Sequence, residues 1–173
     1  NGYLRPMNIA APALFLDRLA AGFDRIRLGV HDGVEVALGY DWDGGVAEPA
    51  PRIAQVFTST LAGGGYGAIG NELAPVCRHL LRAAYLGTLL AATKLRKRHV
   101  VLTLIGGGVF GNPLELVWDS LGWAIDRSDA LAPSGLQVFV NARDQCPARH
   151  VLDMVRARGG LQVAWSPDGP TLI

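Results

Sequence analysis

The sequence predicts an α/β domain in which helices cover a mainly parallel sheet. From residue 53 onward, β-branched apolar runs typical of strands alternate with segments whose apolar residues recur at the three- and four-residue steps of a helix. That alternation requires crossover connections and favours parallel strands. The length of 173 residues and the 50% of apolar residues suit one domain with a buried core.

The first third of the chain predicts two kinds of element. Residues 10–23 have helical spacing, and residues 53–59 form a short strand pattern. Between them, residues 25–38 alternate around Asp32 and Gly33, which predicts a β-hairpin with Asp-Gly at its turn. Residues 39–52 contain Gly, Pro, Asp and Trp and predict a surface loop.

The longest predicted helix covers residues 71–95 and ends in a basic run. Residues 99–105 are nearly all apolar, which predicts a strand buried on both faces. A helix over residues 113–126 follows, with Asn112 as its N-cap and Pro113 at its first position. The remaining predicted elements are a strand at 136–141, a helix at 147–158 and a strand at 161–165.

Charge and composition limit the function classes. The formal net charge of +1 provides no field for nucleic acid or an anionic membrane, so we expect neither as a partner. Cys77 and Cys146 are too few for a disulfide scaffold and favour a reducing cytoplasm, with a secreted effector left open. The four histidines share no metal-ligand spacing, and we expect no metal. Because the chain starts at Asn1 without Met, we expect a fragment of a longer protein.

The glycines are concentrated in two clusters. Nine of the 22 fall at residues 63–70 and 106–111. Residues 106–112 (GGGVFGN) follow the predicted buried strand and precede a helix, the position where α/β proteins bind ligands. Glycines there allow close backbone approach, and free N–H groups suit an anion such as a diphosphate. No lysine follows to reach a γ-phosphate, which disfavours an NTPase; a turn without a ligand is the alternative.

Residues 100–124 (VVLTLIGGGVFGNPLELVWDSLGWA) resemble the second ligand loop of macrodomains, in which a strand, a G-[VIA]-[FY]-G turn and a helix wrap the diphosphate and distal ribose of ADP-ribose. Residues 55–62, 80–93 and 136–143 are similar to the family's neighbouring elements, so the resemblance covers about residues 55–155. It implies a macrodomain-like three-layer α/β/α architecture with a mainly parallel or mixed central sheet, and ADP-ribose as ligand without a further cofactor.

The sequence departs from the common macrodomain pattern in two places. Gly107 and Gly108 stand where most macrodomains have Ser or Thr, and this form is closer to the MavL-like branch of ADP-ribosyl hydrolases. The family's first ligand loop, with Asn-Ala-x-Asn, is not evident. It either precedes Asn1 or is represented by residues 1–9, and the motif alone does not transfer hydrolytic activity.

The resemblance implies a ligand wall formed by the whole glycine-rich turn. Tyr66 would flank the same site, with a lid or linker as the alternative, and Asn141 would meet the adenine edge, with a solvated loop as the alternative. The wall residues are Gly106, Gly107, Gly108, Val109, Phe110, Gly111 and Asn112.

Asp32, Asp41 and Asp43 are the candidate catalytic residues. Cleavage of a glycosidic bond at the distal ribose needs a carboxylate that activates water or stabilises a sugar cation. MavL-like enzymes use aspartates ahead of the strand that resembles residues 55–62, which these three match in kind; ordinary turn aspartates are the alternative. We expect hydrolysis of protein-linked ADP-ribose, with the arginine linkage favoured, or else a reader that binds ADP-ribose without turnover.

Overall fold

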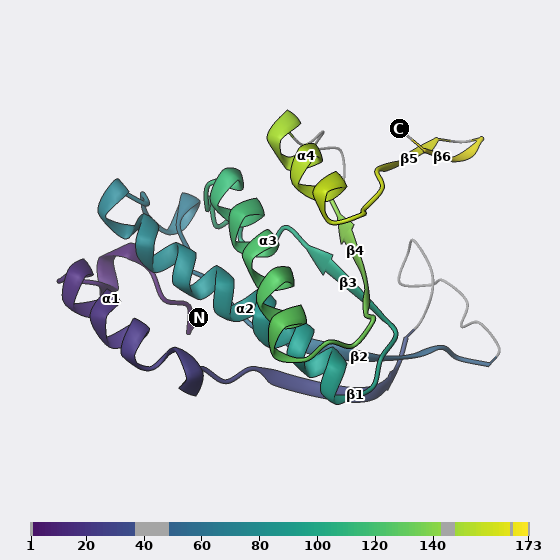
Figure 1. Cartoon of the computed structure of the whole chain (residues 1–173). Coiled ribbons are helices and arrows are strands. Elements are labelled where there is room, and N and C mark those ends of the chain that lie inside the picture. The colour runs from purple at the N-terminus through teal and green to yellow at the C-terminus, as the bar shows by residue number, and fades with distance from the viewer. Residues whose placement is uncertain (1, 37–48, 143–147, 167, 173) are drawn as a thin grey trace.

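The computed structural model describes residues 2–36, 49–142, 148–166 and 168–172 and has a mixed α/β architecture (Figure 1). These residues include four α-helices, six strands and four short 3-10 helices. The α-helices and strands come in the order α1 (Pro12–Ala21), β1 (Gly29–Glu35), β2 (Arg52–Phe57), α2 (Ala74–Lys94), β3 (His99–Thr103), α3 (Leu114–Leu131), β4 (Gln137–Asn141), α4 (Arg149–Ala157), β5 (Val163–Ser166) and β6 (Gly169–Leu172).

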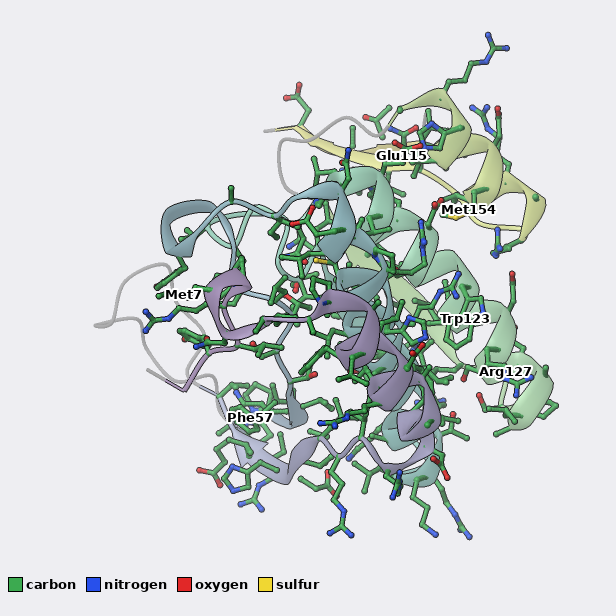
Figure 2. The ribbon with its side chains drawn as sticks, turned by 90° about the vertical axis from the view of Figure 1, so that its left-hand side faces the viewer. Met7, Phe57, Glu115, Trp123, Arg127 and Met154 are labelled. Atoms are coloured by element: carbon green, nitrogen blue, oxygen red, sulfur yellow. The ribbon has the colours of Figure 1, made fainter. Side chains whose placement is uncertain are left out.

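The core lies where α2 packs along α3, with α1 against α2 (Figure 1). Leu81 and Leu89 of α2 and Leu121 of α3 are almost fully buried, and burying each such side chain stabilises the fold by about 1.5–3 kcal/mol. Gly122 of α3 lies against Met154 of α4, leaving no room for a Cβ. Figure 2 shows Glu115, Trp123 and Arg127 spaced along α3, with Met154 of α4 beside it. All four predicted helices are therefore confirmed, within a few residues at their ends.

The strands form three two-stranded sheets. β3 and β4 are parallel, with Thr103 opposite Asn141, while β1–β2 and β5–β6 are antiparallel. The helix α3 connects β3 to β4, so the predicted parallel crossover is confirmed. Within the described residues the strands pair two by two, and no continuous central sheet joins them.

The predicted hairpin at residues 25–38 is wrong. The chain continues through Asp32 and Gly33 as one strand, β1, which pairs with β2 instead of folding back on itself. The pairing register shifts between His31 and Val34, and Gly33 has a φ of 72°. A glycine with positive φ serves a β-bulge as well as a tight turn, which is why the Asp-Gly signal was misleading.

The prediction that strand 99–105 is buried on both faces is also wrong. Leu102 is 4% exposed, but Val101, its neighbour on the other face, is 67% exposed. Phe139, the partner of Val101 on β4, is 52% exposed. Helices α2 and α3 pack against one face of this pair, and the described residues place no layer on the other.

Helix α4 is linked to α3 by a bidentate ion pair. The Arg158 guanidinium, just after α4, donates to both carboxylate oxygens of Asp126 at 2.8 and 2.6 Å. β5 and β6 then form an antiparallel pair in which Ser166 lies opposite Gly169. Among the described residues, no helix has both the length and the apolar character needed to cross a bilayer.

Candidate functional site

The two glycine clusters are joined to each other. The Gly63 amide donates to the Phe110 carbonyl at 2.9 Å. Gly64 and Gly111 both have positive φ, at 58° and 60°, and a Cβ on Gly64 would overlap the Val109 carbonyl oxygen. Glycine is required at these contacts because only its backbone can approach so closely in this conformation. The segments 63–67 and 106–111, predicted separately, thus form one structure.

The Asn112 side chain links the segment at Leu61 to the start of the glycine turn. It is 2% exposed, and its side-chain amide donates to the carbonyls of Leu61 at 2.8 Å and Gly106 at 3.2 Å. The predicted role as N-cap of the following helix is therefore wrong. The helix begins at Leu114 with Pro113 in the cap position and without a side-chain cap bond. The Leu61 carbonyl gains its donor from this side chain, whereas the Gly106 carbonyl also accepts the Asn112 backbone amide at 2.9 Å.

The turn leaves an uncapped helix end next to exposed backbone. The first α3 amide bonded to a preceding carbonyl is that of Val117, which donates to Pro113 at 3.1 Å. Gly108 is exposed, with open space where a Cβ would lie, and Val109 is 76% exposed. Free amides at a helix N-terminus attract anions through their partial positive charge.

Three aromatic rings pack around the turn. Phe110 makes edge contacts with Tyr3 at 5.0 Å and with Tyr66 at 5.7 Å between ring centroids, and Tyr3 and Tyr66 are 6.0 Å apart. Tyr66 therefore lies against the glycine turn, while its predicted role at a ligand site stays a prediction. The Leu4 carbonyl next to Tyr3 accepts the Ala62 amide at 2.8 Å, which ties the N-terminal segment to the same place. These rings give one wall of the site an aromatic surface.

Tyr85 of α2 fixes the end of β3 just before the turn. Its hydroxyl donates to the Thr103 carbonyl at 2.9 Å and accepts the Ile105 amide at 3.1 Å. Burial raises the pKa of this hydroxyl far above its usual value, so it stays protonated and keeps donating. The glycine turn is thereby held at a defined position relative to α2.

Asn141 ends β4 opposite Thr103, so it lies at the carboxyl edge of the parallel pair, on the same edge as the glycine turn. The predicted contact of Asn141 with the adenine edge stays a prediction.

Asp32 lies away from the glycine turn. It is on β1, and the Lys97 ammonium donates to its carboxylate at 2.7 Å, just beyond the C-terminal end of α2. The hydrogen bond from Lys97 lowers the pKa of Asp32 below its usual value. The glycine clusters lie beside the N-terminal end of α2, whose 21 residues span about 30 Å. The structure thus does not bring Asp32 together with the turn, and Asp41 and Asp43 lie outside the described residues.

The structure adds polar residues that the sequence patterns did not single out near the turn. Thr60 is 2% exposed, and its hydroxyl lies under Gly106 without a hydrogen-bond partner. Glu72 turns its carboxylate back onto Gly70, and Glu115 lies in the first turn of α3. Glu72 comes two residues after Gly70 and Glu115 four residues after Gly111, and this spacing was the available signal in the sequence.

No group of three or more metal-ligating side chains is found within the described ranges. When the chain is compared with known proteins, no family model matches it, and no curated protein does.

Proposed function

We propose that this chain binds ADP-ribose at the carboxyl edge of β3, in a macrodomain-like arrangement. The observation that carries the proposal is the double glycine structure, in which Gly63 and Gly64 brace the backbone of Val109 and Phe110, next to the exposed Gly108 and the uncapped start of α3. Such a surface offers several amides to a diphosphate without a side chain in the way.

The remaining parts of the ligand have matching surfaces. In this proposal the ribose rests against Phe110 and Tyr66, and Asn141 meets the adenine edge. The ligand is the only small molecule required, with no metal or further cofactor. A three-layer α/β/α form belongs to the proposal as well, since the exposed face at Val101 and Phe139 leaves room for a further layer.

The proposed activity is hydrolysis of ADP-ribose from protein side chains, with the arginine linkage favoured and ADP-ribosylated cytoplasmic proteins as partners. Asp41 and Asp43 are its proposed catalytic residues. A non-catalytic reader is the second candidate, and a specific observation favours it. Asp32, the third proposed catalytic residue, is paired with Lys97 at the opposite end of α2 from the glycine turn.

Calorimetry with ADP-ribose tests the binding proposal. Gly108→Val adds a side chain only to the open space in front of the turn, because nothing of the protein lies within 4 Å of a Cβ there. We expect wild type to bind and Gly108→Val to bind at least about tenfold more weakly, equivalent to about 1.4 kcal/mol. Ala130→Val, at an exposed position near the far end of α3, is the matched control and should bind like wild type. Absence of binding by wild type would contradict the proposal.

Release of free ADP-ribose from an arginine-ADP-ribosylated protein separates the enzyme from the reader. Turnover that disappears in Asp41→Ala or Asp43→Ala supports the hydrolase. Binding without release, unchanged in both variants and in Asp32→Ala, leaves the reader.

A further inference from the structure

Arg82 of α2 packs its guanidinium on an aromatic ring instead of pairing it with a carboxylate. Its Cζ lies 4.7 Å from the centroid of the Trp123 ring of α3 (Figure 2). Its Nε is buried without a hydrogen-bond partner among the described residues, whereas Nη1 and Nη2 are not buried and donate to none of them. A cation is attracted to the face of an aromatic ring. Packing therefore holds this guanidinium while its terminal nitrogens stay available to a ligand.

The Trp123 ring that supports the guanidinium is itself held in place. The Phe23 ring, in the short 3-10 helix Phe23–Arg25, meets Trp123 edge-on at 6.0 Å between centroids. The same ring meets His79 of α2 edge-on at 6.1 Å. Contacts from three elements thus set the plane of Trp123, and with it the direction in which Arg82 presents its donors.

A second arginine lies one helical turn before Arg82. Arg78 is four residues earlier on α2, a spacing that places two side chains on one helix face with Cβ atoms about 5–6 Å apart. It is half-buried, and within the described part of the chain no carboxylate forms an ion pair with either arginine. Burial and the charge of Arg78 lower the pKa of Arg82, and the charge of Asp119 on α3 opposes them. The two cations repel each other, and Asp119 compensates only in part.

The two arginines fit a doubly charged oxyanion. A planar guanidinium matches two oxygens of one phosphate group with parallel hydrogen bonds. A phosphate monoester carries about −1.5 to −2 charges near neutral pH, which balances two arginines, whereas a carboxylate carries a single charge. A phosphate bound there would also remove the repulsion between Arg78 and Arg82.

We propose that Arg78 and Arg82, with Trp123 supporting the Arg82 guanidinium, bind the phosphate group of a phosphate monoester. Free phosphate and a phosphorylated side chain share this chemistry, and the two probes named below distinguish these sources. The inference does not rest on the proposed function, since the glycine turn contributes no residue to this site, and either can fail without the other.

An NMR titration of the ¹⁵N-labelled chain tests the proposal. The probes are inorganic phosphate and N-acetyl-O-phosphoserine amide, at constant ionic strength and about pH 7.5, where a phosphate monoester is mostly a dianion. Acetate is the carboxylate control. We expect saturable shifts of the Arg82 Nε–H and the Trp123 indole N–H with phosphate, and none with acetate. Tighter binding of the phosphoserine derivative assigns the site to a phosphorylated side chain, and equal or weaker binding assigns it to free phosphate.

Removal of single charges locates the site. Arg78→Gln leaves the contact between Arg82 and Trp123 in place and should weaken phosphate binding at least about fivefold, and Arg82→Gln should abolish it. Lys94→Gln removes an exposed lysine from the same helix and, as the matched control, should bind like wild type. The proposal is overturned if neither probe gives a saturable shift by about 20 mM, if Arg78→Gln and Lys94→Gln bind equally well, or if the shifts are confined to the two glycine clusters.

Discussion

Asn112 shows how one side chain can organise the candidate site. From sequence it looks like a helix cap, because Asn before Pro at a helix start is a common capping pattern. In the structure its amide instead bridges the carbonyls of Leu61 and Gly106, which belong to two segments 45 residues apart. The sequence pattern reports only local geometry, whereas the need of the buried Leu61 carbonyl for a donor arises from the tertiary fold.

Asn112→Ala is predicted to lower the free energy of unfolding by about 1–3 kcal/mol, because it leaves the Leu61 carbonyl without a donor. Urea denaturation of the purified chain measures this loss. Asn71→Ala, at an exposed position ahead of α2, is the control and should stay within about 0.5 kcal/mol of wild type. Equal effects of the two substitutions would argue against the bridging role.

The Cys77 thiol is predicted to be inert in the native chain. It is fully buried in α2, and burial raises its pKa to about 11. In the Cys146→Ser variant, where Cys77 is the remaining cysteine, a thiol reagent at pH 8 should react only after denaturant is added. Because the folded pKa exceeds the usual 9.0, this group's contribution to stability is present below pH 9 and declines as the pH rises toward 11. Fast labelling of the folded protein would contradict the burial.

At the scale of elements, helices were predicted better than strands. Long apolar periodicity located α2 closely, whereas the shorter pattern at residues 113–126 located the start of α3 but ended five residues before Leu131. The strand His99–Thr103 was located correctly but assigned two buried faces, since an apolar run does not tell whether a second layer covers it. The prediction of a turn at Asp32–Gly33 was wrong because Asp-Gly suits both a tight turn and a β-bulge, so the two residues alone do not distinguish them.

The end of α2 contains a residue in an unfavourable conformation. Arg96 has a φ of 55°. The helix ends in a turn in which the Lys97 amide donates to the Ala92 carbonyl and the Arg96 amide donates to the Thr93 carbonyl. Glycine is the usual residue at this position of the motif.

Arg96→Gly is predicted to raise the free energy of unfolding by up to about 1 kcal/mol, because it relieves the left-handed strain at the end of α2. Thermal denaturation of the variant measures the gain. Lys94→Gly, two residues earlier inside α2, should instead destabilise the chain by about 0.5–1 kcal/mol. A destabilised Arg96→Gly would show that its side chain contributes more than its backbone conformation costs.

At the scale of the whole molecule, the α/β class and the parallel crossover followed from sequence, while the assembly of the strands did not. Pairing between β1 and β2 joins segments separated by residues 36–51, and no local pattern specifies such a partner. The contact between the two glycine clusters was likewise not predictable from a local sequence pattern. Each was visible as a run of glycines, but their contact through Gly63 and Phe110 depends on how α2 and β3 are placed.

The most direct measurement of the central claim is an ADP-ribose titration followed by amide chemical shifts of the ¹⁵N-labelled chain. ADP-ribose binding at the glycine turn predicts the largest shifts at Gly106–Gly111, with smaller ones at Gly63–Gly65 and Asn141, and none along β2. An unchanged spectrum at saturating ADP-ribose, or shifts confined to residues outside the two glycine clusters, would contradict it.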